Sequence, residues 1–100
     1  MGETRVVHCK KEIYTVLIDR TTPYGNPFPI SRTCTREESI AKHLEWLLKW
    51  IENKEEVVVY GFSNDWVCEH LYLLEGEILG CWCKPLACHG DNLVKLIKER

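Results

Sequence analysis

The segment GCWCKPLACHGD, residues 80–91, places three cysteines and a histidine within nine positions. Thiolate and imidazole groups have the softness that zinc prefers, so Cys81, Cys83, Cys88 and His89 are candidate metal ligands. Their spacing, C-x-C-x4-C-H, differs from the paired C-x2-C of common zinc ribbons, and adjacent residues such as the last two rarely reach one ion together. We therefore take zinc as one hypothesis for this segment, which we call the cysteine loop.

A second hypothesis is a reactive thiol site in the same loop. Here Cys88 or Cys83 is the nucleophile, His89 is the base and Asp91 orients that base. Cys88 precedes a predicted helix, whose free N–H groups favour an anion and should lower the pKa of the thiol. The chain has no P-loop, and no arginine follows a cysteine as in phosphatases of the tyrosine type. Packing alone is the third interpretation, because cysteine is among the most buried residue types.

A second group of candidate residues lies at positions 20–28. The guanidinium of Arg20 suits a phosphate or a carboxylate. Gly25 permits a positive φ, and Pro27 forces Asn26 to be extended, which fixes the direction of its amide. Such an amide suits a base or an amide-like ligand. The alternative is a rigid turn that packs its aromatic side chains on the core. The predicted ligand-binding residues are Arg20, Tyr24, Gly25, Asn26, Pro27 and Phe28.

These residues need a scaffold of strands and helices. Segments rich in β-branched residues predict strands, and the first two of them should form a hairpin. Thr35 and Glu38 form a capping box that should begin a helix, and Gly76 should close the helix that follows it. Asp91 should cap the last helix. The predicted strands are 5–9, 14–18, 57–60 and 77–82, and the predicted helices are 35–52, 65–74 and 92–99.

The order of these elements predicts the fold class. Strands alternate with helices in the second half, which favours parallel β-α-β pairing. We predict that residues 1–100 form one α/β domain, a small sandwich with a mixed sheet of about four strands and three helices. The cysteine loop would then follow the carboxyl end of a strand, where ligands bind in open α/β sheets.

Two tryptophans widen the apolar arc of the first predicted helix. Trp46 and Trp50 lie four positions apart, roughly 100° from the main apolar stripe. This arrangement indicates a helix that is buried on two sides. The alternative is a partner surface, including a homodimer built through these two residues.

Composition limits the class of protein. The 100 residues suit one small domain, and a net charge of −2 with scattered lysines and arginines does not indicate a nucleic-acid partner. We see neither an apolar signal segment nor a run long enough to span a membrane, so we expect a cytoplasmic protein. In a reducing compartment, the six cysteines should be thiols or metal ligands rather than disulfides.

Four segments together resemble a known family of small proteins. They are the loop at residues 24–28, the capping box at 35–38, Trp46-Leu47, and residues 79–93. The family is known only as a domain of unknown function, with members in bacteria, archaea, phages and viruses. The resemblance covers most of the chain, and the last segment is its most specific part. It implies which residues form the site but implies no reaction.

These observations predict a ligand-binding domain. The loop at 24–28 and the cysteine loop should face one pocket that takes a nucleotide, a nucleoside or a related phosphorylated molecule. Chemistry at Cys88 or His89 would make the domain an enzyme. The alternative is a zinc-stabilised module without enzymatic activity that binds a protein or a nucleic acid.

Overall fold

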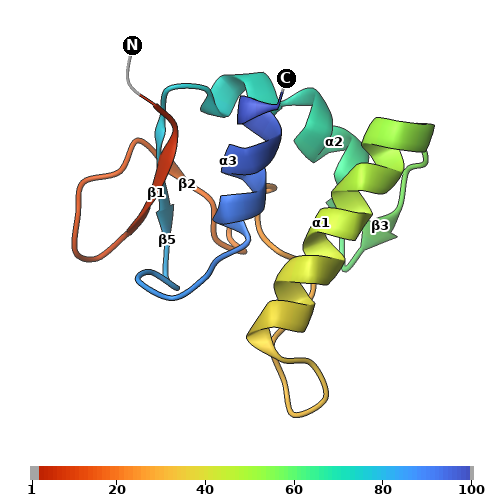
Figure 1. Ribbon diagram of the computed structural model, residues 1–100, viewed down its shortest axis with the longest axis horizontal. Coiled ribbons are helices and arrows are strands. Elements are labelled where there is room, and N and C mark those ends of the chain that lie inside the picture. The colour runs from red at the N-terminus through yellow and green to blue at the C-terminus, as the bar shows by residue number, and fades with distance from the viewer. Residues whose placement is uncertain (1–2, 100) are drawn as a thin grey trace.

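A three-stranded parallel sheet carries the cysteine loop (Figure 1). The computed structural model describes residues 3–99. β5 (Ile78–Cys81) is the central strand, and β1 (Arg5–His8) and β2 (Val16–Leu17) pair with it on either side, both in parallel. The cysteine loop therefore leaves the carboxyl end of the central strand, as the sequence predicts.

The predicted hairpin between the first two strands is wrong, because both strands pair with β5. The amide of Ile18 donates to the carbonyl oxygen of Gly80 at 3.0 Å, and the amide of Cys9 donates to that of Cys81 at 2.9 Å. Residues 9–15 therefore cross from one edge of the sheet to the other. This connection has the polar composition of a turn, but composition does not show which strand becomes the neighbour.

The longest helix, α1 (Arg36–Asn53), begins at the predicted capping box. The amide of Glu38 donates to Oγ1 of Thr35 at 3.1 Å, and the amide of Thr35 donates to Oε1 of Glu38 at 3.0 Å. The helix ends at Lys54, whose φ of 56° is left-handed. Because these signals are local, the sequence predicts this helix well.

The remaining helices are shorter than expected or begin elsewhere. The segment predicted as one helix at 65–74 forms α2 (Asn64–Glu69) and the 3-10 helix η1 (Leu71–Leu74), separated at His70. α3 (Gly90–Lys98) has His89 at its N-cap position. The predicted cap, Asp91, lies in the first turn instead, where its carboxylate accepts from the amide of Cys88 at 3.1 Å.

A small hairpin lies apart from the parallel sheet. It pairs β3 (Val58–Val59) with β4 (Phe62–Ser63) in antiparallel orientation. Tyr60 and Gly61 form its turn with φ values of 49° and 83°, the two positive angles of a type I′ turn. The strand predicted at 57–60 therefore exists, but it does not join the central sheet.

The helices and the sheet enclose the core. α3 packs on β1 and η1, and α1 packs on α2 (Figure 1). A Cβ atom on Gly90 would lie 2.7 Å from Cδ1 of Ile18 and 2.9 Å from Cγ2 of Val6, so the start of α3 approaches the sheet closely. Within residues 3–99, three α-helices and five strands in two sheets confirm the predicted α/β class.

The two tryptophans of α1 have different environments. Trp46 is 2% exposed, and its Nε1 donates to the carbonyl oxygen of Val57 at 2.6 Å. Trp50 is half-buried, with Nζ of Lys54 lying 5.2 Å from the centre of its ring. The interpretation of a helix buried on two sides therefore holds for Trp46. The homodimer through both residues stays a prediction.

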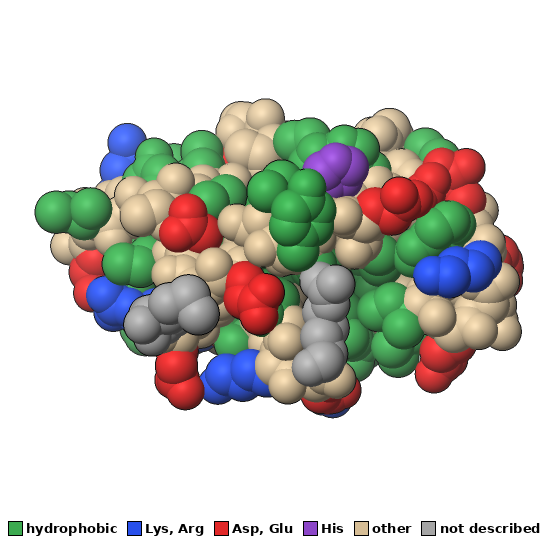
Figure 2. Space-filling view, turned by 90° about the horizontal axis from the view of Figure 1, so that it is seen from above, with side chains coloured by type: hydrophobic (Ala, Val, Ile, Leu, Met, Phe, Trp, Pro, Cys, Tyr) green, Lys and Arg blue, Asp and Glu red, His purple; other side chains and the backbone are tan. Residues whose placement is uncertain are grey.

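Charges are mixed on the face seen in Figure 2. Acidic and basic side chains alternate there with apolar groups, and no large area of one sign is visible. On this face, a charged ligand would therefore meet individual side chains rather than a broad field of one sign. None of the helices within residues 3–99 combines the length and the apolar composition that a membrane crossing requires.

Candidate functional site

A cavity of about 440 Å³ lies between the cysteine loop, the segment after β2 and the first turns of α1. It brings together the two groups of residues that the sequence singles out, although they lie some sixty positions apart. We call it the loop cavity. It is lined by Asp19, Arg20, Thr21, Asn26, Phe28, Ile30, Arg36, Ser39, Ile40, Cys81, Trp82, Cys83, Ala87, Cys88 and His89.

Three of the predicted ligand-binding residues do not line the loop cavity. Tyr24 is buried, and its hydroxyl donates to the carbonyl oxygen of His70 at 2.8 Å. Pro27 is fully buried. Gly25 is not among the glycines with positive φ, and a Cβ atom there would lie 2.7 Å from Cα of Arg20. These residues shape the loop and pack on the core, as the rigid-turn alternative states.

Asn26 lines the loop cavity, but its amide also holds the loop to α1. Its Nδ2 donates to Oγ of Ser39 at 2.9 Å, and its Oδ1 accepts from the amide of Phe28 at 2.9 Å. The backbone oxygen of Asn26 accepts from Nε of Arg20 at 2.9 Å. The direction of the amide is therefore fixed, as predicted, by contacts within the protein.

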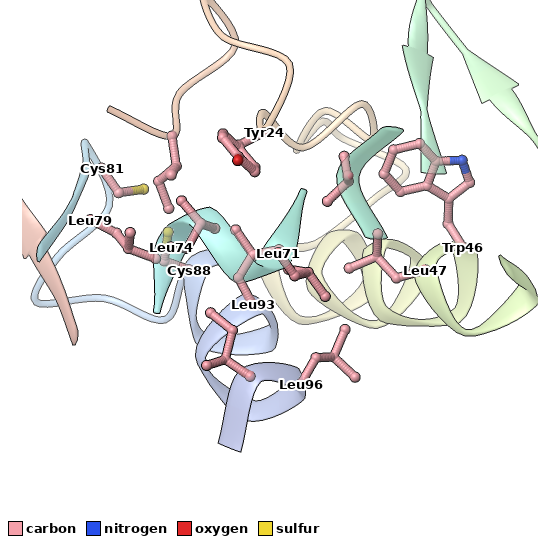
Figure 3. Packing of buried hydrophobic residues seen from close by; sticks show 13 residues of the cluster. Tyr24, Trp46, Leu47, Leu71, Leu74, Leu79, Cys81, Cys88, Leu93 and Leu96 are labelled. Carbon is pink, nitrogen blue, oxygen red and sulfur yellow. The ribbon is translucent and has the colours of Figure 1, made fainter. Parts of the chain in front are cut away.

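Cys81, Cys88 and His89 form a buried cluster beside the loop cavity. One sulfur or nitrogen atom from each residue lies within 4.8 Å of the other two. Figure 3 shows the sulfur atoms of Cys81 and Cys88 close together, one from the end of β5 and one just before α3. The closeness follows from the fold, since the loop leaves the sheet and returns to it through α3.

Cys83, the fourth predicted ligand, lies outside this cluster although it lines the loop cavity. The softness of its thiol made Cys83 a candidate, but a strand keeps alternate side chains on one face only as long as it continues. β5 ends at Cys81, so the alternation stops before it reaches Cys83. The cluster therefore contains three of the four residues that the sequence predicts.

Hydrogen bonds fix the orientation of the His89 ring. Its Nε2 lies 2.8 Å from the carbonyl oxygen of Ile18, which can only accept a hydrogen. Nε2 therefore carries a proton, and Nδ1 is the nitrogen that faces the cluster. Nδ1 lies 3.5 Å from Sγ of Cys88, which also accepts from the amide of Gly90 at 3.3 Å. Nδ1 thus lies beside the thiols of the cluster.

The two thiols of the cluster differ in acidity. A hydrogen bond from Cys88 lowers the pKa of Cys81, and contacts with His89 and the amide of Cys83 lower it further, against the effect of burial. The pKa of Cys88 is raised, because it shares its proton with Cys81 and because it is buried. The amide of Gly90 at the start of α3 lowers the pKa of Cys88, as the helix terminus predicts, but the shared proton and burial outweigh it, so the net lowering that we expected is wrong. The pair shares one proton and behaves as one unit.

Asp91 does not orient His89 in the described hydrogen bonds. Its carboxylate accepts from the amide of Cys88 at 3.1 Å and from Nζ of Lys84 at 2.8 Å. His89 is instead oriented by Ile18. The predicted order of nucleophile, base and orienting acid is therefore not assembled at Cys88, His89 and Asp91.

Several residues of the loop cavity do not stand out in the sequence. Trp82 is 53% exposed, and its Nε1 donates to Oδ2 of Asp19 at 3.0 Å. Burial slightly raises the pKa of Asp19, but hydrogen bonds from Thr21 and Trp82 outweigh it and lower the pKa below its usual value. Arg36 donates from Nη1 to the carbonyl oxygen of Ala87 at 3.2 Å. Nothing in the capping box indicates that this arginine reaches the cysteine loop.

Comparison with known proteins identifies the family. Residues 4–99 match the family model described as Domain of unknown function (DUF4326). The chain is 30% identical over 95 residues to the uncharacterized 12.4 kDa protein in the nrdA-td intergenic region of Enterobacteria phage T4, a match that covers 95% of this chain and 78% of the phage protein. No solved structure gives a significant match. The chain therefore belongs to the DUF4326 family of domains of unknown function.

Proposed function

We propose that this domain binds a small anionic ligand, of the nucleotide or phosphorylated type, in the loop cavity. The observation that carries the proposal is the pair of arginines in its lining, Arg20 and Arg36. Each guanidinium is held by one backbone carbonyl, and neither forms an ion pair with a carboxylate among residues 3–99. Oriented guanidinium groups with free N–H donors suit phosphate and carboxylate oxygens.

The remaining lining residues suit the organic part of such a ligand. The volume of about 440 Å³ lies within the range of about 300–1,000 Å³ that is typical of small-molecule sites. Phe28, Ile30 and Ile40 supply apolar surface. Trp82 is 53% exposed and lines the cavity, where its ring could stack on a base. Stacking of a base on an aromatic side chain contributes about 1–3 kcal/mol.

The test is a calorimetric titration of the protein with nucleotides and phosphorylated sugars. We expect Arg36→Gln and Arg20→Gln each to weaken the best ligand at least about tenfold, or ~1.4 kcal/mol. Arg32→Gln is the matched control, because Arg32 is exposed and does not line the cavity. Equal losses in all three variants, or no binding by the unmodified protein, would contradict the proposal.

A second candidate function rests on the cysteine cluster. We propose that Cys81, Cys88 and His89 hold a zinc ion, since their atoms lie within 4.8 Å of one another. If zinc only stabilises the domain, chelation should unfold it. Elemental analysis should find about one zinc per chain. Cys81→Ser and Cys88→Ser should lose it, whereas Cys34→Ser should keep it because Cys34 is buried outside the cluster.

A further inference from the structure

We infer that a metal ion held by Cys81, Cys88 and His89 keeps an open coordination position that faces the loop cavity, so that the ion contacts the bound ligand directly. This inference rests on the zinc site proposed above and deepens it. Structural zinc ions have four protein ligands, whereas catalytic zinc ions have three and leave the fourth position to water or substrate. The question is therefore whether the chain supplies a fourth ligand.

The distance between the ligand atoms of Cys88 and His89 agrees with one tetrahedral ion, and the Cys81 sulfur lies within 4.8 Å of both. Bond lengths of about 2.3 Å to sulfur and about 2.0 Å to nitrogen place two ligand atoms of a tetrahedral zinc about 3.5 Å apart. Sγ of Cys88 and Nδ1 of His89 are 3.5 Å apart. Two adjacent residues reach one ion here because His89 uses its nearer nitrogen. The other nitrogen, Nε2, donates its hydrogen bond to the carbonyl oxygen of Ile18.

The surroundings of the cluster match those of metal ligands. A metal-bound histidine usually donates its other N–H to a carbonyl or a carboxylate, as Nε2 of His89 does to Ile18 at 2.8 Å. Sγ of Cys88 accepts from the amide of Gly90 at 3.3 Å. An N–H donor of this kind stabilises a thiolate. The structure thus provides the outer contacts for two of the three ligands.

The side of the ion left free by these ligands faces the loop cavity. Cys81, Cys88 and His89 all contribute to its lining, so the space next to the cluster is open to a ligand. Cys83 contributes to the same lining but lies outside the cluster of described residues. A water molecule or a ligand atom from the cavity would therefore complete the tetrahedron.

The charge of the site favours an anionic fourth ligand. Two thiolates cancel the charge of Zn²⁺, and a neutral imidazole adds none. The centre is thus neutral, and the two positive charges of Arg20 and Arg36 in the same lining outnumber the one negative charge of Asp19. A third thiolate from Cys83 would make the centre negative and would oppose an anion. The open position and the two arginines therefore both favour an anionic ligand.

Cobalt substitution tests the inference without a known substrate. The protein is purified without a histidine tag, loaded with Co²⁺ and titrated with azide, then with inorganic phosphate. We expect the visible bands of the bound cobalt to shift with azide, and X-ray absorption at the metal edge to find two sulfur neighbours. Cys83→Ser should leave the sulfur count and the azide response unchanged.

Other outcomes would overturn the inference in distinguishable ways. A closed site would give three sulfur neighbours, and azide would not shift the cobalt bands. One of these sulfur neighbours would be lost in Cys83→Ser. Failure to retain any metal would overturn both the zinc site and the open position. Binding of nucleotide by calorimetry is measured separately. A cobalt site that responds to azide but not to any nucleotide would therefore contradict the proposed ligand and leave the open position established.

Discussion

Nε2 of His89 donates a hydrogen bond to the carbonyl oxygen of Ile18 across 2.8 Å. This contact joins the first residue after β2 to the N-cap of α3, two points 71 positions apart. It places a proton on Nε2 and turns Nδ1 toward Cys88. One backbone carbonyl thus decides which nitrogen of His89 faces the cluster.

Two replacements of His89 should separate the metal binding of its Nδ1 from the hydrogen bond of its Nε2 to Ile18. Glutamine places an amide N–H near the position of Nε2 but has no equivalent of Nδ1. His89→Gln should therefore stay folded and lose metal, whereas His89→Ala should also lose about 1–3 kcal/mol of unfolding free energy because the carbonyl of Ile18 is left without its partner. Urea denaturation of the metal-free proteins and elemental analysis measure the two effects. Equal stability of the two variants would show that the hydrogen bond contributes nothing.

Two glycines provide a matched test of the loop that carries Arg20. A Cβ atom on Gly25 would lie 2.7 Å from Cα of Arg20 and 2.8 Å from the carbonyl oxygen of Asp19, so the backbone must move. We expect Gly25→Ala to destabilise the fold by about 1–3 kcal/mol and to weaken ligand binding, since Arg20 is displaced. Denaturation and calorimetry measure both effects.

Gly61 is the control for that substitution. It has a positive φ of 83°, and no atom lies within 4 Å of a Cβ atom built there. Gly61→Ala should cost about 1 kcal/mol from backbone strain in the turn and should leave ligand binding unchanged. If Gly61→Ala weakened binding as much as Gly25→Ala, the effect would come from general destabilisation.

The thiol of Cys68 should make the fold less stable at alkaline pH. Burial is the main cause that raises the pKa of its thiol from 9.0 to about 11, and the thiol donates to the carbonyl oxygen of Leu47 at 3.6 Å. In the unfolded chain the thiol loses its proton near pH 9, whereas in the folded chain it keeps the proton up to about pH 11. Cys68 therefore stabilises the fold fully below pH 9, and this contribution is lost between pH 9 and about 11.

Urea denaturation at about pH 8 and about pH 11 measures this loss, which should be at most about 2 kcal/mol. Lysines and tyrosines also titrate in this range, so Cys68→Ala is the reference. We expect the unfolding free energy of the unmodified protein to fall more between the two pH values than that of Cys68→Ala. Parallel decreases in the two proteins would show that Cys68 is not the cause.

The sequence predicts local features of this fold better than distant ones. The capping box of Thr35 and Glu38 predicts the start of α1, because both partners lie within one turn. The pairing of β1 with β5 depends on a neighbour more than seventy positions away, and a polar connection at residues 9–15 looks like a hairpin turn. Local composition therefore identifies the strands but not their partners.

The same distinction explains the outcome at the site. The sequence predicts that the cysteine loop and the loop of Asn26 should face one pocket, and the structure brings both into the lining of the loop cavity. It does not indicate Arg36 or Ser39, because their place in the cavity depends on how α1 packs. Cys83 was a candidate because its thiol suits zinc, but β5 ends at Cys81 and does not bring Cys83 into the cluster.

Trp82 should contribute to ligand binding through its ring. It is 53% exposed and lines the loop cavity, and Nζ of Lys10 lies 5.3 Å from the centre of its ring. Trp82→Ala should weaken a nucleotide about tenfold or more, since stacking contributes about 1–3 kcal/mol. Trp82→Phe keeps an aromatic face but loses the hydrogen bond to Asp19, so its affinity should lie between those of Trp82→Ala and the unmodified protein.

Trp50→Ala is the control for Trp82, because Trp50 is half-buried on α1 and does not line the loop cavity. Its affinity for the nucleotide should equal that of the unmodified protein, by calorimetry. In the proposed complex the Trp82 ring contacts the base and the Arg36 guanidinium contacts the phosphate. A non-phosphorylated nucleoside should therefore bind more weakly to Trp82→Ala and equally well to Arg36→Gln. If both variants weakened the nucleoside and the nucleotide equally, the two residues would act by holding the cavity in shape and not by separate contacts with the ligand.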